Sequence, residues 1–352
     1  MKTKSLHILT CLLLMLLTGC RNEEPVGESQ PEERMVNVSL GITTRADDVN
    51  TSDIPDVLYL WIFDGADCLS FTQLDNPQFS GVDIQGNPVQ TVDVQLLTTN
   101  GTQLKFYVVL NNVTDEDGSP VQFNASTTLA QLNNLPFTLG TYGSDNKVPM
   151  SGTADLTIES TSNDYLVEVP AERAVAKLEL FVTKNTPGSN LQITGITLSN
   201  NPETGILFRK EDFTPQIDGE SSVSLIDNGI EINASLNEAD APGSDDLHLF
   251  EGDGSKLQKI TLTNPYLLEN PWGDKYIHLD DGSTSITDSN FRYYITLNYT
   301  LGGSPVSKKI YLTKIERNTL NKVFIRIKET VFDIEVSYSV KDWEMEVLTP
   351  EF

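Results

Sequence analysis

Cysteine is scarce in this chain, which has three in 352 residues: Cys11, Cys20 and Cys68. Cys11 falls inside an apolar leader and Cys20 comes directly after it, so only Cys68 remains for the body of the protein. A single cysteine allows no internal disulfide. The fold must therefore rest on a buried core, and the length is sufficient for two domains.

Basic residues are also few. The chain has 24 Lys and Arg against 50 Asp and Glu, which gives a formal net charge of −26 at pH 7. Loss of Lys2 and Lys4 with the leader makes the remainder still more acidic. Because such a surface repels phosphate backbones and anionic lipid headgroups, nucleic acid is excluded as a partner.

Sequence signals for catalysis are missing. Outside the leader the two histidines, His248 and His278, lie neither beside a cysteine nor in a zinc-ligand spacing, and GxSxG, P-loop and GxGxxG motifs are absent. The acidic stretches 114–120 and 251–255 do not complete the EF-hand pattern and are interpreted as turns. We therefore expect no enzyme activity, no cofactor and no metal site.

Long hydrophobic runs are absent as well. The apolar stretch Cys11–Leu17 is too short for the roughly 30 Å core of a bilayer. It follows Lys2 and Lys4 and ends in small residues, which is the layout of a secretory signal peptide. We predict a signal peptide over residues 1–19.

The signal peptide ends in "LTGC", which resembles the bacterial lipobox, whose cysteine is lipidated in the mature protein. The sequence thus predicts acylation, with palmitate among the acyl chains, at Cys20. More than one acyl chain is enough for stable anchoring, so the precursor is expected to be an outer-membrane lipoprotein. Residues 20–34 carry Glu and Pro without apolar periodicity, and they are interpreted as a flexible tether.

From Met35 onward the sequence consists of short strand-like runs separated by turn signals. Asp-Gly and Asn-Gly pairs tolerate the positive φ of tight hairpins. They recur at Asp64-Gly65, Asn100-Gly101, Asp117-Gly118, Asp218-Gly219, Asn228-Gly229, Asp253-Gly254 and Asp281-Gly282. This pattern predicts the all-β class and an antiparallel β-sandwich.

The strand-like runs fall into two sets. Val57–Phe63 and Thr102–Asn112 are expected to be central strands of the first sandwich. A second set begins at "AVAKLELFV" and continues through "LQITGITLSN", "RYYITLNYT", "KKIYLT", "NKVFIRIK" and "FDIEVSYSV". The break near Pro170 predicts two tandem domains, residues 35–172 and 173–352.

One stretch has helical periodicity. Leu129 and Leu132 fall on one helical face, Ser126 or Thr127 is the expected N-cap, and Pro136 ends the pattern. We expect this helix to cross over the first sandwich.

Six segments of the sequence resemble fimbrillins, the FimA-like lipoprotein pilins of type V pili in Bacteroidales. They occur in the order seen in that family: "VLYLWIFDGADCL", "FYVVLNN", "VPMSG", "ERAVAKLEL", "IERNTLNKVFIRI" and "VKDWE". The resemblance implies two transthyretin-like β-sandwich domains and export as a lipoprotein. It also implies a role in cell adhesion as a subunit of a surface fimbrium (pilus), assembled with other subunits after an arginine-specific protease removes the first strand.

The segment before Arg45 alternates in the manner of a half-buried strand, with apolar residues at Val36, Val38, Leu40 and Ile42. Burial of these four side chains would contribute roughly 6–12 kcal/mol as an upper estimate, which matches the stability of a typical domain, about 5–15 kcal/mol.

Removal of this strand would leave an open groove that attracts a strand of another chain. We predict cleavage between Arg45 and Ala46, with loss of residues 35–42 and of the lipid. Cleavage after Arg34 would spare the strand.

A candidate donor strand lies near the C-terminus, where five apolar residues alternate on one face: Phe332, Ile334, Val336, Tyr338 and Val340. Periodicity alone favours two ordinary edge strands of a monomeric lipoprotein. The family resemblance favours donor-strand exchange.

The competing interpretation is a glycan-binding outer-membrane lipoprotein. Trp272 in "NPWGDKY" could stack on a sugar ring, although a Trp that closes the end of a sandwich is the commoner case. A fimbrial tip adhesin would satisfy both interpretations, with a host or bacterial surface ligand as an added partner. Shaft, tip and anchor roles all remain open.

Overall fold

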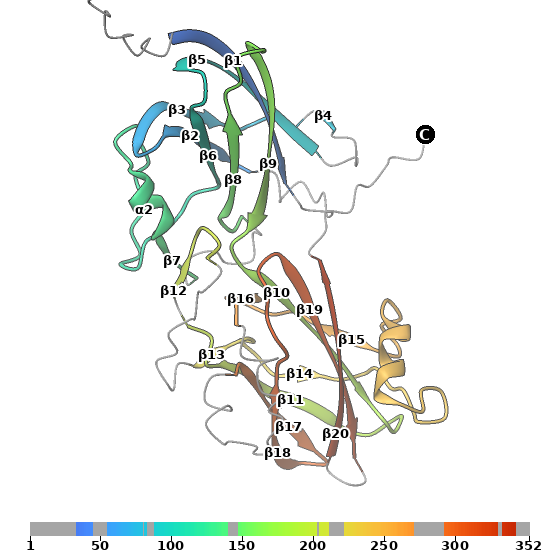
Figure 1. Ribbon diagram of the computed structural model, residues 1–352. Coiled ribbons are helices and arrows are strands. Elements are labelled where there is room, and N and C mark those ends of the chain that lie inside the picture. Colours follow the sequence, from blue (N-terminus) through green and yellow to red (C-terminus); the bar gives the residue numbers. More distant parts are fainter. Residues whose placement is uncertain are drawn as a thin grey trace, which may run out of the picture.

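The computed structural model describes residues 33–44, 55–79, 81–82, 88–139, 147–202, 204–210, 222–270, 292–329 and 333–342. These residues form an all-β protein of packed sheets (Figure 1), as predicted. Within these ranges, no helix is long and apolar enough to cross a membrane.

The N-terminal half of the described chain forms one eight-stranded sheet. Its spatial order is β3 (Asp67–Asp75), β2 (Val57–Asp64), β6 (Gln103–Leu110), β8 (Met150–Thr157), β9 (Asp164–Arg173), β1 (Glu33–Thr44), β5 (Pro88–Thr99) and β4 (Gly81–Val82). β8 and β9 pair only at one end, through Met150 with Arg173 and Ser151 with Glu172. The two parts of the sheet therefore diverge and face each other, with a core between them drawn from β1, β5 and β9 on one side and β2, β6 and β8 on the other.

The predicted hairpin turns explain how this sheet is connected. Gly65 joins β2 to β3 with φ of 57°, and Gly101 joins β5 to β6 with φ of 84°. Residues other than Gly, Asn and Asp rarely adopt this left-handed backbone conformation. β2 is buried along its length up to Phe63, as its continuous apolar run predicted.

The outer face of β2 and β6 is covered by residues 113–139, which include α2 (Leu129–Asn133) and β7 (Pro136–Thr138). The predicted helix is present, but its N-cap is Thr128 rather than Ser126 or Thr127. Thr128 accepts a hydrogen bond from the Gln131 backbone N–H at 3.2 Å, and the Gln131 side chain accepts one from the Thr128 N–H at 2.8 Å. Only Thr128 has a Gln three residues later, so only it can form this capping box.

The C-terminal half consists of two facing five-stranded sheets. One contains β10 (Ala176–Lys184), β15 (Gln258–Ile260), β16 (Tyr266–Leu267), β19 (Thr319–Lys328) and β20 (Asp333–Asp342). The other contains β11 (Leu191–Ser199), β13 (Ser222–Ser224), β14 (Ile230–Glu231), β17 (Tyr294–Leu301) and β18 (Ser304–Tyr311). A large apolar core lies between them. The 3₁₀ helix η1 (Ser244–Phe250) packs on the outer face of the sheet that contains β10 and β19, where Phe181 stacks on Phe324.

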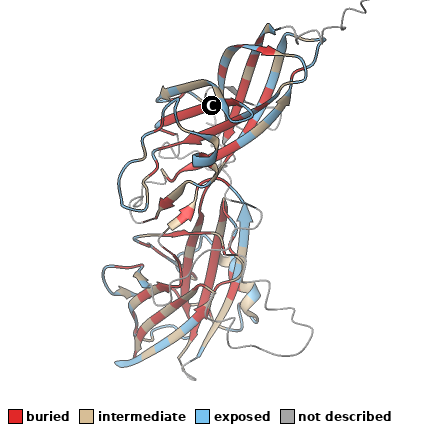
Figure 2. Cartoon of the chain, turned by 60° about the vertical axis from the view of Figure 1, so that its left-hand side comes forward, coloured by how far each residue is buried: buried red, intermediate tan, exposed pale blue. Residues whose placement is uncertain are grey.

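Buried residues line the strands of both halves (Figure 2). The chain passes from β9 of the eight-stranded sheet to β10 of the C-terminal half between Arg173 and Ala176. A two-stranded sheet of β7 and β12 (Thr204–Ile206) then connects the halves. The placement of a domain boundary at residue 173, and the transthyretin-like topology, stay predictions.

Two strand pairs are parallel, although the sequence predicted an antiparallel arrangement. β1 runs parallel to β9 and β10 runs parallel to β19. The other strand pairs of the described chain are antiparallel. Turn signals specify how neighbouring strands in the sequence pair; they carry no information about strands more than a hundred residues apart.

Candidate functional site

β1 lies inside its sheet, between β5 and β9 (Figure 1). It pairs with β5 antiparallel from Glu33 to Thr43 and with β9 parallel from Asn37 to Thr44. The strand begins two residues before the predicted Met35. It is therefore hydrogen-bonded along both edges, and it is not the ordinary edge strand that periodicity alone favoured.

The four predicted apolar side chains of β1 all point into the core. Val36, Leu40 and Ile42 are 0% exposed and Val38 is 1% exposed. They pack in one cluster with side chains of β2 and β6, among them Leu58, Leu60, Phe106 and Val108. The alternation read from the sequence thus corresponds to real burial on one face.

Because of this position, removal of β1 would destabilise the N-terminal half strongly. Without it, β5 and β9 would each present an unpaired ladder of backbone N–H and C=O groups, and the cluster would be open to water. The burial of four aliphatic side chains accounts for roughly 6–12 kcal/mol. We call the space that β1 occupies, between β5 and β9, the β1 position.

The outer face of β1 carries mostly polar residues, and two of its neighbours are carboxylates. Asn37 donates a hydrogen bond to an Asp164 carboxylate oxygen at 2.7 Å, and Ser39 donates to Asp93. Met35, on the same face, is exposed. Leu97 pairs with Met35 and Leu166 pairs with Ser39, and both leucines are exposed. The β1 position therefore has an apolar floor and an outer rim that contains both carboxylates and leucines.

Arg34 fastens the start of β1 to the segment 159–165. Its guanidinium donates to the Asn163 side-chain oxygen at 3.0 Å, the Tyr165 hydroxyl at 3.1 Å and the Ser160 carbonyl at 3.3 Å, and it also contacts the Glu159 carbonyl. A guanidinium with these partners is poorly available to the specificity pocket of an arginine protease.

Five predicted site residues lie outside the described ranges: Cys20, Arg45, Ala46, Trp272 and Phe332. β1 ends at Thr44, the residue before the predicted cleavage site. Lipidation, cleavage and ligand contact at these positions stay predictions.

The predicted donor strand is β20. It pairs with β19 from Asp333 to Asp342 and with no other described strand, so it forms the edge of its sheet. Ile334 and Val336 pack against the core of the C-terminal half. Tyr338 and Val340 are exposed, at 39% and 49%.

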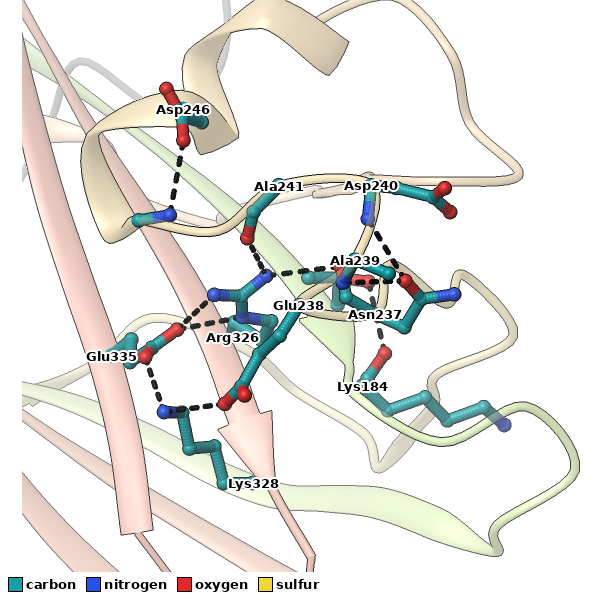
Figure 3. A network of polar contacts seen from close by, with 12 residues as sticks. Lys184, Asn237, Glu238, Ala239, Asp240, Ala241, Asp246, Arg326, Lys328 and Glu335 are labelled. Carbon is teal, nitrogen blue, oxygen red and sulfur yellow. Dashed lines mark hydrogen bonds and ion pairs between the residues drawn. The ribbon is translucent and has the colours of Figure 1, made fainter.

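Glu335, on the opposite face of β20, forms an ion pair with the fully buried Arg326 of β19 (Figure 3). The Arg326 Nε donates to Glu335 at 2.7 Å, and its Nη1 donates to the Ala241 carbonyl at 2.6 Å. Lys328 also pairs with Glu335 and, at 2.7 Å, with Glu238. We call this set the Arg326 network.

The pKa values of Lys328 and Glu238, at the surface of this network, are shifted in the directions that ion pairing causes. Hydrogen bonds to Glu238 and Glu335 raise the pKa of Lys328, and the hydrogen bond from Lys328 lowers the pKa of Glu238. Glu238 is solvent-exposed and Lys328 is partly exposed, so these pKa shifts report proximity rather than a large contribution to stability.

Sequence reasoning missed the Arg326 network and treated Arg34 only as an alternative cleavage site. A signal was present in "NKVFIRIK", where a single arginine interrupts an apolar strand. An isolated charge in such a run needs a partner when buried, but its partner on β20 could not be identified without the pairing register. Among the described residues, no group of three or more His, Cys, Asp or Glu is placed to hold a metal ion.

No family model and no curated protein matches the sequence. Solved structures do match. A candidate cell adhesion protein from Parabacteroides distasonis has a TM-score of 0.55 at 13% identity, over 89% of this chain and 98% of that one. A fimbrial assembly protein from the same species has a TM-score of 0.51 at 11% identity, over 88% and 97%.

A third neighbour is the tip fimbrial protein Mfa3 from Porphyromonas gingivalis, in a C-terminally truncated form. Its TM-score is 0.51 at 17% identity, over 87% of this chain and all of that one. The structural neighbours are thus fimbrial and candidate cell adhesion proteins of Bacteroidales, as the sequence resemblance predicted. At these identities the match establishes a shared fold that extends over most of the chain.

Proposed function

We propose that this chain is a structural subunit of a cell-surface fimbrium. In this proposal it is exported as an outer-membrane lipoprotein through Cys20 and assembles with other subunits by donor-strand exchange. The observation that carries the proposal is the place of β1, an N-terminal strand that is central in its sheet, fully buried on one face and directly followed by Arg45.

The physical basis is the instability of the sheet without β1. Another β-strand fills the resulting groove most completely, because it pairs with the backbone groups of both β5 and β9 and covers the apolar floor. Because the groove belongs to every processed copy, strand addition links copies end to end and produces a fibre. β20, which lies at one edge of its sheet in the C-terminal half, is the proposed donor.

The structural neighbours support this role, since one is a fimbrial assembly protein and one is a fimbrial tip protein. An arginine-specific protease is the proposed processing partner, since Arg45 follows the end of β1 at Thr44 and Arg34 is held by the segment 159–165. No observation on the described residues favours a glycan-binding function.

The test replaces Arg45 with alanine. Arg45→Ala should accumulate as a folded, membrane-bound, fatty-acid-labelled precursor that forms no polymers, because β1 stays in place. The wild-type protein should yield polymers whose N-terminus is Ala46. Polymer ladders on gels, N-terminal sequencing and fatty-acid labelling give the three measurements.

Arg34→Ala is the matched control. It removes an arginine only a few residues away and should leave processing after Arg45 and polymer formation intact. If assembled wild-type material begins at Cys20 and none begins at Ala46, the shaft and tip roles fail, and an anchor or a non-fimbrial lipoprotein is left.

A further inference from the structure

The outer face of β17 and β18, in the C-terminal half, carries two tyrosines and two cations. Tyr294 pairs with Tyr311 in the strand register, and their rings lie 5.6 Å apart. The Lys309 Nζ lies 3.7 Å from the centre of the Tyr294 ring. The Arg292 guanidinium lies 5.5 Å from the centre of the Tyr311 ring. We call these four residues the tyrosine–cation face.

The two cations of this face form no ion pair with a described residue. Lys309 is exposed, whereas its neighbour Lys308 pairs with Asp333 at 3.5 Å. The Arg292 Nη2 donates to the Leu312 carbonyl at 2.9 Å, and the Arg292 Nε is buried without a hydrogen-bond partner. The whole chain has a net charge of −26. Two neighbouring cations without carboxylates therefore make this face an attractive surface for an anionic partner.

The outer face of β5 and β9, in the N-terminal half, has the opposite charge. Asp93 and Leu166 lie in one row, on either side of Ser39, and Glu168 follows two residues further along β9 on the same face. Leu97 and Leu166 are 56% and 73% exposed. Neither β5 nor β9 exposes a lysine or an arginine. We call Asp93, Leu97, Leu166 and Glu168 the carboxylate–leucine face.

The two faces complement each other in charge and in apolar surface. Carboxylates such as that of Glu168, which is exposed and forms no ion pair with a described residue, would give Lys309 and Arg292 the acceptors that they lack. The exposed leucines would pack on the flat tyrosine rings. Because the two faces lie in different halves of the chain (Figure 1), each face would meet its complement on a second copy.

We infer that copies of this chain associate through these faces, with the carboxylate–leucine face of one copy on the tyrosine–cation face of the next. The contact uses a different surface on each partner, so it is heterologous and does not close into a dimer. β5 and β9 flank β1 and remain whichever strand fills the β1 position. The inference goes beyond the proposed function, since in the proposed fibre this contact would join subunits side by side.

The dependence of association on salt is the first test. Copies with the same net charge repel each other, so salt should strengthen a nonspecific association, whereas it weakens a contact between opposite charges. The full chain carries Arg45→Ala and Cys20→Ser, so that β1 stays in place and no lipid is attached. We expect its association constant, measured by sedimentation equilibrium, to fall about tenfold between about 0.05 M and about 0.5 M NaCl.

Charge reversals test the two faces separately. Lys309→Glu and Glu168→Lys, each in the same background, should lower the association constant at low salt about tenfold. Glu168→Lys makes the chain less negative, so its loss of association would not come from greater overall repulsion. Lys105→Glu is the matched control, because Lys105 is exposed on β6 outside both faces, and it should leave the association constant unchanged.

A mixture of the two variants tests whether the faces are partners. The Lys309→Glu chain keeps an intact carboxylate–leucine face, and the Glu168→Lys chain keeps an intact tyrosine–cation face. Each alone should be mainly monomeric, and an equal mixture should recover the association of the parent chain.

Several outcomes would overturn the inference. They are a parent chain that stays monomeric at low salt, an association that salt strengthens, and reversals that change nothing. Loss of association with Lys309→Glu alone, or a mixture that stays monomeric, would show that the two faces are not each other's partners. Because β1 stays in place throughout, failure of the proposed function would appear in the Arg45→Ala comparison and leave these measurements unaffected.

Discussion

Arg326 lies two residues before the end of β19, next to a run of apolar residues, and is 0% exposed. A buried guanidinium persists only when its donors are satisfied and its charge is paired. Glu335 and the Ala241 carbonyl meet that need from two different elements. The residue therefore ties β19 to β20 and to the segment before η1 at a single point.

This pairing leads to a prediction at the scale of the residue. Glu335→Ala should lower the free energy of unfolding by about 3 kcal/mol, the lower end expected for breaking a buried pair, since Glu335 retains 22% exposure. Urea denaturation monitored by fluorescence measures the change.

Glu238→Ala is the matched control, because Glu238 also pairs with Lys328 but is 52% exposed. It should change stability little, as exposed ion pairs do. If the two variants lose the same free energy of unfolding, then the pair with the buried Arg326 stabilises the protein no more than an exposed ion pair does.

At the scale of the element, β1 and β20 carry similar alternating patterns but differ in their placement. β1 has neighbours on both edges and its four apolar side chains are buried, whereas β20 has one neighbour and exposes Tyr338 and Val340. In the proposed exchange, a strand that leaves the position of β20 loses one ladder of hydrogen bonds, while a strand that fills the whole β1 position gains two. This difference would favour the exchange.

A peptide competition tests this account. A synthetic peptide of residues 33–44, added in tenfold excess over chain cleaved after Arg45, should refill the β1 position and suppress polymerisation by at least fivefold. A control peptide with Val38→Ser and Leu40→Ser keeps the backbone ladders but loses two core side chains. It should compete poorly, and equal competition by both peptides would mean that burial does not drive strand exchange. Light scattering measures the rate.

At the scale of the whole molecule, the two halves meet through an apolar cluster, in which Tyr107 and Phe137 pack with Phe208 and Leu268, and through buried polar contacts around Arg317. Arg317, with a side chain 1% exposed, donates to the Leu207 carbonyl at 2.8 Å and pairs with Glu269 at 2.7 Å. Ser151 of β8, in the N-terminal half, donates to the same Leu207 carbonyl at 2.7 Å. In the proposed fibre, each subunit would transmit pulling force from one half to the other through this junction.

Arg317→Ala should loosen the junction, because the Leu207 carbonyl loses one of its two donors and the Glu269 carboxylate loses its ion pair. We expect the single unfolding transition to separate into two, seen by calorimetry, with a loss of about 3 kcal/mol in the less stable half. Arg209→Ala is the control: Arg209 pairs with Glu172 at 3.1 Å but is 55% exposed, so its removal should leave one transition. Two transitions already present in the unmodified protein would contradict this view of the junction.

Much of the fold could be predicted from local sequence pattern. The all-β class, the runs that form β2, β6, β10 and β19, and the hairpin turns at Gly65 and Gly101 all follow from side-chain alternation and from turn chemistry, which depend on residues close together in the chain. The helix cap was wrong by one or two positions, because the decisive contact was the reciprocal bond between Thr128 and Gln131.

The sequence by itself determined which side chains of β1 face inward, since Val36, Val38, Leu40 and Ile42 alternate with polar residues and a strand has a period of two. Only the tertiary structure decided that β1 lies between β5 and β9 and runs parallel to β9, and that Arg34 and Arg326 find their partners on distant segments. The physical reason is the range of the forces involved. Alternation is a property of neighbouring residues, whereas strand order and the pairing of a buried charge depend on how the whole chain closes its sheets.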